Sequence, residues 1–173
     1  LYKCYAEAEA GKNIEKSLKA IEERYNEIIK GLGLKLSLKE QFETIKKNFE
    51  ALAGKDYAAS RGEYLNGIIM ANYLGYEFID AATVICFDKD GEFDSEKTNA
   101  VCEAKFANIE RAVVPGFYGA MPNGKVKTFS RGGSDVTGSI VARALKADMY
   151  ENWTDVSGFL AADPRIVNNA KPI

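Results

Sequence analysis

The stretch Phe129-Ser-Arg-Gly-Gly-Ser-Asp135 combines the end of a strand, two glycines and the start of a helix. Glycines let the backbone approach an anion closely, and the first amides of a helix direct the positive end of its dipole toward that anion. The stretch therefore predicts phosphate or carboxylate binding. An ordinary strand-to-helix loop with a Ser or Asp N-cap remains the alternative, because short Gly-rich motifs are weak signals.

The segments on both sides of this stretch predict strands and a helix. Before it, the turn signal Asn123-Gly124 separates two short β-type runs and predicts a hairpin of residues 117–121 and 126–129. After it, a helix is expected with Ile140, Val141, Ala144 and Leu145 on its apolar side. A further strand is expected over Met149–Trp153.

The first third of the chain predicts an αα-hairpin over residues 12–54. Two apolar stripes with helical spacing flank the Gly31-Leu-Gly33 break. Ser37 and Glu40 have the spacing of a capping box that would start the second helix. The stripes are Ile14, Leu18, Ile21, Tyr25 and Ile28, and then Leu38, Phe42, Ile45, Phe49 and Leu52.

The middle of the chain predicts a helix that connects to strands. A helical pattern over residues 62–74 ends at Gly75, and residues 77–87 favour a strand or two. Asp94 or Ser95 would cap a helix to about Arg111, followed by a strand at residues 112–115. A helix between two strands favours parallel pairing, so the pattern predicts a layered α/β domain.

Composition excludes several classes of function. The chain of 173 residues has 46% hydrophobic and 28% charged residues and a net charge of −2, which indicates a folded domain that binds no nucleic acid. No apolar run is long enough to cross a bilayer, and the start shows no signal-peptide pattern, so a cytoplasmic location is expected. The absence of histidine excludes His-dependent catalysis and histidine zinc sites. The three cysteines are expected to be buried reduced thiols, and no metal site is expected.

Two further segments carry polar residues where ligands bind. Trp153-Thr-Asp-Val-Ser-Gly158, with Ala162-Asp-Pro-Arg165 after it, follows the last expected strand, where open α/β sheets bind ligands. Arg165 could reach phosphate oxygens, although a surface turn built by Asp163-Pro164 explains the segment equally well. Ser60-Arg-Gly-Glu63 is the third segment, where Glu63 is also explained as a favourable dipole partner near a helix N-terminus.

Together these three segments resemble the aspartokinases, a branch of the amino acid kinase family, and the resemblance extends from the helical hairpin to Ile173. It implies a three-layer αβα sandwich with a mainly parallel central sheet. It also implies ATP and Mg²⁺ as cofactors, L-aspartate as substrate, and a homo-oligomeric parent enzyme. The resemblance assigns Arg131 to a substrate carboxylate, Glu63 and Asp135 to the substrate ammonium, and Gly132 and Gly133 to close backbone approach. The residues that it assigns to nucleotide binding are Thr154, Asp155, Leu160 and Arg165.

The sequence departs from the family pattern in three places. The family often has an aromatic residue near the adenine where this chain has Leu160. The N-terminal strand with its Lys-Phe-Gly-Gly-Ser-like segment, the later Gly-Ala-Lys segment and the regulatory ACT domains are not in the chain. Residues 1–173 are therefore expected to be a partial catalytic domain, incomplete at both ends, with little kinase activity alone. Another acceptor (glutamate, acetylglutamate or a nucleotide) and a non-catalytic interaction module remain the alternatives.

Overall fold

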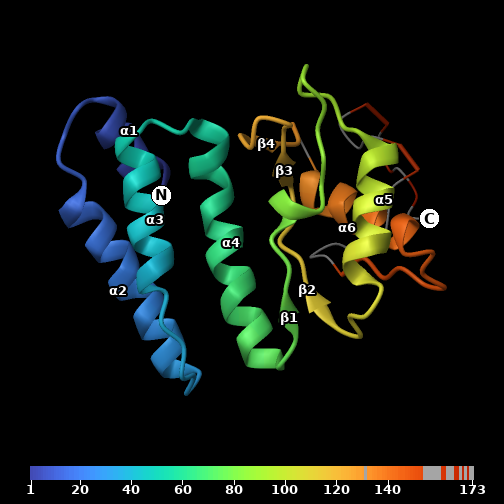
Figure 1. Cartoon of the computed structure of the whole chain (residues 1–173), viewed down its shortest axis with the longest axis horizontal. Helices are drawn as coiled ribbons and strands as arrows, with labels where there is room; N and C mark the ends of the chain where they lie inside the picture. Colours follow the sequence, from blue (N-terminus) through green and yellow to red (C-terminus); the bar gives the residue numbers. More distant parts are fainter. Residues whose placement is uncertain (131, 154–160, 163–165, 168, 170, 172–173) are drawn as a thin grey trace.

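The computed structural model describes residues 1–130, 132–153, 161–162, 166–167, 169 and 171. These residues form α-helices with short strands between the fourth and sixth of them (Figure 1). The helices are α1 (Tyr2–Glu9), α2 (Glu15–Gly31), α3 (Lys39–Glu50), α4 (Lys55–Leu74), α5 (Ser95–Phe106) and α6 (Gly133–Ala144), with a 3-10 helix η1 (Ala81–Thr83). The strands are β1 (Glu77–Phe78), β2 (Ala112–Val113), β3 (Tyr118–Ala120) and β4 (Val126–Thr128).

The predicted helical hairpin is present as α2 and α3. Its apolar stripes form a core in which Leu18, Phe42 and Phe49 are buried, together with residues of α1 and α4. The predicted capping box is wrong, because the hydroxyl of Ser37 accepts a hydrogen bond from the amide of Lys39 and α3 has no side-chain cap. Leu52 was also expected in the stripe but is 53% exposed, since α3 ends before it.

Helix α4 is the central element of the molecule. It runs between the N-terminal helices and the strands (Figure 1), and Tyr64 packs against both hydrophobic cores. The helix begins at Lys55, seven residues before the expected start at Gly62, and it ends as predicted with Gly75 in the left-handed conformation at φ 68°. The positive φ of 108° at Gly54 lets the chain turn sharply out of α3 into this helix.

The strands form a small parallel pair and an antiparallel hairpin. Strands β1 and β2 pair in parallel, with α5 as the connection between them. Strands β3 and β4 pair in antiparallel fashion, and Ala120 of β3 also forms a parallel bridge to Cys86. In Figure 1, α4 covers one face of these strands while α5 and α6 cover the other. The α/β architecture with a preceding helical hairpin is therefore confirmed. The expected mainly parallel central sheet is small in the described residues, where the parallel pairing consists of β1 with β2 and the Cys86–Ala120 bridge.

Several predicted boundaries differ from the structure. The segment 77–87, which was expected to be a strand or two, is interrupted by η1. There the Asp80 carboxylate accepts a hydrogen bond from the amide of Ala82. Helix α5 has the expected Asp94 cap but ends at Phe106, five residues before Arg111. The hairpin loop is longer than two residues: the amide of Gly124 donates to the carbonyl of Met121, and Gly124 adopts φ 79°.

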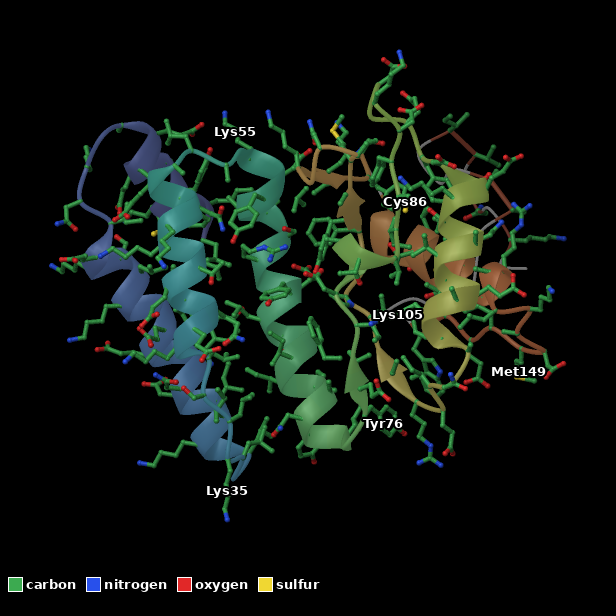
Figure 2. All side chains as sticks on the ribbon, viewed as in Figure 1. Lys35, Lys55, Tyr76, Cys86, Lys105 and Met149 are labelled. Atoms are coloured by element: carbon green, nitrogen blue, oxygen red, sulfur yellow. The ribbon has the colours of Figure 1, made fainter. Side chains whose placement is uncertain are left out.

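The expected strand at Met149–Trp153 is wrong. These residues form no strand, and the side chains of Met149 and Trp153 are 74% and 89% exposed. Figure 2 shows Met149 at the outer edge of the molecule. Within the described residues, no helix combines the length and the apolarity needed to span a bilayer.

Candidate functional site

The two glycines before α6 have different structural roles. Gly132 is the N-cap and has φ 59°, a left-handed conformation that favours glycine. In the part of the chain that the structure describes, nothing lies within 4 Å of the place that a Cβ on Gly132 would take. A Cβ on Gly133 would lie 2.6 Å from Cβ of Phe117, so no side chain fits there. Gly132 therefore offers the exposed backbone, whereas Gly133 packs α6 closely against the start of the hairpin.

The first turn of α6 is held in place by Thr137. The amide of Phe117 donates to Oγ1 of Thr137 at 3.0 Å, and the Thr137 hydroxyl donates to the carbonyl of Gly133 at 2.6 Å. By helix geometry the amides of Gly133, Ser134 and Asp135 have no intrahelical acceptor, and Gly132 provides no side-chain cap. Amides in this position at a helix start are the groups that bind anions in many proteins.

A groove of about 360 Å³ adjoins this helix start. Ala112, Val114 and Gly116 line it from the β2 side, and α6 lines it with Ser134, Thr137, Gly138 and Val141. Gly116 allows the close approach, because a Cβ there would lie 2.9 Å from Cα of Ser134. The groove thus runs along β2 and the segment after it, against one face of α6 that includes the first turn of the helix.

The two predicted ammonium ligands lie on different helices. Asp135 is exposed in the first turn of α6, and its carbonyl accepts a hydrogen bond from the Tyr150 hydroxyl at 3.3 Å. Glu63 is exposed on α4, where its charge adds to the effect of burial in raising the pKa of Tyr25 on α2. No contact among the described residues joins Glu63 to Asp135.

A buried arginine, Arg61, lies in the same Ser-Arg-Gly-Glu segment as Glu63. It is 5% exposed, and its guanidinium carbon lies 4.5 Å from the Tyr57 ring centroid and 4.4 Å from that of Tyr64. Two residues along an α-helix correspond to about 200°, so Glu63 and Arg61 occupy opposite sides of α4. Arg61 faces the strands, where the Tyr118 ring centroid is 5.4 Å away, and Glu63 faces the side of α2.

A larger groove, of about 840 Å³, lies at the opposite end of β4 from α6. It separates the α3–α4 turn from the β3–β4 loop, and three lysines line it: Lys55, Lys125 and Lys127. Lys127 lies 3.9 Å from a carboxylate oxygen of Asp56, which also accepts hydrogen bonds from the amide and hydroxyl of Thr128. Of the predicted site residues that the structure describes, none lines this groove.

Comparison with known proteins gives the family. The model of the amino acid kinase family matches residues 6–173. The chain belongs to the amino acid kinase family.

The relatives of this amino acid kinase chain are aspartokinases. It is 38% identical to aspartokinase 3 of Bacillus subtilis strain 168 over 126 residues, which are 68% of the chain and 28% of that protein. Its fold matches the crystal structure of Clostridium acetobutylicum aspartate kinase with a TM-score of 0.85 and 55% identity, covering 98% of the chain and 39% of that protein. Escherichia coli aspartokinase III in complex with aspartate and ADP matches with a TM-score of 0.71 and 27% identity, over 91% of the chain and 40% of that protein. The chain thus spans well under half the length of these relatives.

Five residues predicted for the site of this amino acid kinase chain lie outside the described residues: Arg131, Thr154, Asp155, Leu160 and Arg165. The structure describes Gly132, Gly133 and Asp135 together at the start of α6, and Glu63 on α4. The assignments of all nine residues to ligands remain predictions.

Sequence reasoning missed Arg61 and its partners in this amino acid kinase chain. The signal was present, because Tyr57, Arg61 and Tyr64 have the spacings i, i+4 and i+7 that place them on one face of a helix. A charged residue within such an apolar stripe is a reason to look for a buried partner.

Proposed function

We propose that this chain is the central part of an aspartate kinase catalytic domain, in a longer enzyme that transfers the γ-phosphoryl group of ATP to the β-carboxylate of L-aspartate. The observation that carries the proposal is the uncapped start of α6 after Gly132-Gly133, beside the groove along β2 and the segment after it. The aspartokinase relatives, including the one in complex with aspartate and ADP, support it.

In the proposed substrate site, charges at both ends of the amino acid fix its orientation. The forked guanidinium of Arg131 pairs with a substrate carboxylate, and Asp135 faces the substrate ammonium. The exposed backbone at Gly132 allows close approach of the substrate, while Gly133 sets the position of the helix. We also assign Glu63 to the substrate ammonium. Because Glu63 lies on α4, this assignment requires the bound substrate to extend from α6 toward α4.

The proposed nucleotide site belongs to the segment after Trp153. Thr154 and Asp155 contact the nucleotide, Leu160 makes apolar contact near the adenine, and Arg165 binds phosphate oxygens. A guanidinium suits this task because it presents paired donors to phosphate and stays charged at all relevant pH values.

The reaction needs no side-chain base. The β-carboxylate of aspartate is already ionised at neutral pH and attacks the γ-phosphorus directly, and ADP leaves. The task of the protein is to place the two reactants in line and to stabilise the charge on the transferred group. Mg²⁺ bound with ATP would supply positive charge that offsets part of the charge on the phosphates.

The remaining parts of the proposal concern the whole protein. Its N-terminal Lys-Gly-Gly strand and its C-terminal ACT domains lie outside residues 1–173, and the complete enzyme is a cytoplasmic homo-oligomer. Sizing chromatography of the complete enzyme and kinase assays of residues 1–173 alone test these points.

An acceptor screen tests the proposed reaction. ADP release by the full-length enzyme is measured with aspartate, glutamate, acetylglutamate and UMP at equal concentrations. Aspartate is expected to give the highest kcat/KM. A higher value with any of the other acceptors would overturn the assignment, and no ADP release with any acceptor would favour a non-catalytic module.

A further inference from the structure

Arg61 is a buried charge with unusual surroundings. Its Nε and Nη2 donate to Oγ of Ser60 at 3.1 and 2.9 Å, and the Ser60 hydroxyl donates to the carbonyl of Tyr57 at 2.8 Å. The rings of Tyr57, Tyr64 and Tyr118 surround its guanidinium at 4.4 to 5.4 Å from their centroids. Such cation–π contacts are strongest where water is excluded, as at this residue with its 5% exposure.

Asp80 supplies a negative charge to the same cluster. One of its carboxylate oxygens accepts hydrogen bonds from the Tyr118 hydroxyl at 2.7 Å and from the amide of Ala82 at 3.0 Å. Arg61 and Asp80 both act on the pKa values of Tyr64 and Tyr118, in opposite directions. The cluster thus joins α4 to β3 through the ring of Tyr118, and β3 to η1 through the bond from Tyr118 to Asp80. A shift of α4 would carry Ser60, Tyr57 and Tyr64 along with Arg61 and would separate its buried charge from Tyr118.

The cluster continues to the start of α6 through Phe117, the residue before Tyr118. Phe117 adopts φ 61°, a conformation that is rare for a bulky side chain. Its amide bonds to Thr137, and its Cβ fills the space that a side chain on Gly133 would need. The backbone from Tyr118 to Phe117 therefore transmits the position of the cluster directly to the first turn of α6.

We propose that Arg61 is a positioning residue that, through Tyr118 and Phe117, fixes the first turn of α6 relative to α4 and so sets the geometry of the amino acid site. This inference rests on the proposed function for its kinetic consequence, and its structural part stands independently. Arg61 itself touches no substrate, since it is enclosed by tyrosines.

The kinetic test compares variants of the full-length enzyme. R61M keeps the volume of the side chain and removes its charge, R61K keeps the charge without the planar fork, and Y118F removes the bond to Asp80. L65A is the matched control, because Leu65 is fully buried one turn along α4 and has no part in the cluster. R61M is expected to raise the aspartate KM about tenfold and the ATP KM by less than about twofold, with smaller effects in R61K and Y118F. L65A is expected to change both KM values by the same small factor.

Hydrogen exchange gives a readout that needs no substrate. In R61M, and more weakly in Y118F, the amides of Phe117 and Val136 are expected to exchange at least about fivefold faster than in the wild type, and L65A is not expected to single out these two amides. Y118F keeps the packing, so the test stands even where R61M fails to fold. Unchanged exchange at Phe117 in Y118F, or equal effects of R61M and L65A, would overturn the positioning role. A wild-type enzyme that prefers another acceptor would overturn only the proposed function, because the exchange result is independent of it.

Discussion

The hydroxyl of Tyr118 donates a 2.7 Å hydrogen bond to Oδ1 of Asp80, although 38 residues separate them. Tyr118 is fully buried in β3, and Asp80 caps the 3-10 helix η1. The bond therefore ties the hairpin to the segment that follows β1.

Removing this hydroxyl should destabilise the fold. Y118F leaves the Asp80 carboxylate with one fewer donor in a buried place, so the free energy of unfolding is expected to fall by about 1–3 kcal/mol. Urea unfolding followed by circular dichroism measures it. Y2F is the control, since Tyr2 is 67% exposed and its loss should change stability little. Equal stability of Y118F and the wild type would mean that the bond adds nothing to the fold.

Tyr118 should also make the free energy of unfolding depend on pH in the alkaline range. Burial, the charge of Asp80 and the hydrogen bond to it together raise the pKa of Tyr118 far above its ordinary value of 10.0. Above pH 10 the native state then keeps a proton that the unfolded state loses. The contribution of the protonated Tyr118 to the free energy of unfolding is therefore complete below pH 10 and declines as the pH rises further. The stability difference between wild type and Y118F is expected to narrow by about 1.4 kcal/mol per pH unit above pH 10. A difference that stays constant from pH 8 to 11 would contradict this.

The glycines before α6 should tolerate alanine differently. G133A forces a Cβ against Phe117 and is expected to cost about 1–3 kcal/mol. G132A meets no neighbour but must adopt φ 59°, for an expected cost of about 1–2 kcal/mol. G31A is the control, because Gly31 lies in α2 with open space around it, and it should be neutral or slightly stabilising. Thermal unfolding ranks the three, and a G133A variant as stable as G31A would refute the close packing.

The three free cysteines should react at different rates. Cys4 and Cys102 are buried, and burial raises the pKa of both thiols, so little thiolate forms at pH 8. Cys86 was also expected to be buried, but it is partly exposed, in the segment between η1 and α5 (Figure 2). Titration with a chromogenic disulfide reagent should label Cys86 first in the native chain and the other two only after denaturant is added. C86S should abolish the first phase.

Kinetics of the full-length enzyme test the proposed ligand contacts. R131A is expected to raise the transition-state free energy with aspartate by about 1–3 kcal/mol, since a charged hydrogen-bond partner is lost. D155N should change the kinetic constants for ATP more than those for aspartate. E63Q and D135N combined should show a coupling energy if both contact the same ammonium, and strictly additive effects would separate Glu63 from that site.

Periodic patterns in the sequence were sufficient for most of the fold. The helical stripes around Phe42 and Phe49, the Gly75 stop signal and the Asp94 cap are local features, and local physics determines them. The segment interrupted at Asp80 is tied to Tyr118, 38 residues away, and a strand at Met149–Trp153 needs a neighbouring strand to pair with. No local pattern encodes either requirement. The parallel pairing of β1 with β2 followed from the rule that a helix between two strands favours parallel pairing.

The candidate site was predictable only where its chemistry is local. The glycine-rich start of α6 could be predicted from the strand–glycine–helix pattern. The structure adds that Gly133 lies so close to Phe117 that no side chain fits there. The Arg61 cluster spans residues 57 to 118. The contact of Arg61 with Tyr118 depends on how α4 docks on the strands, and Tyr118 in turn bonds to Asp80. Contacts of that range are invisible in a single sequence.

Tyr64 contributes to both hydrophobic cores from the middle of α4. A side chain shared in this way couples the packing of the N-terminal helices to that of the strand-bearing half, so the two are expected to unfold as one cooperative unit. On heating, neither half should therefore stay folded after the other has unfolded. A destabilising substitution on one side of α4 should lower the stability of the other side as well.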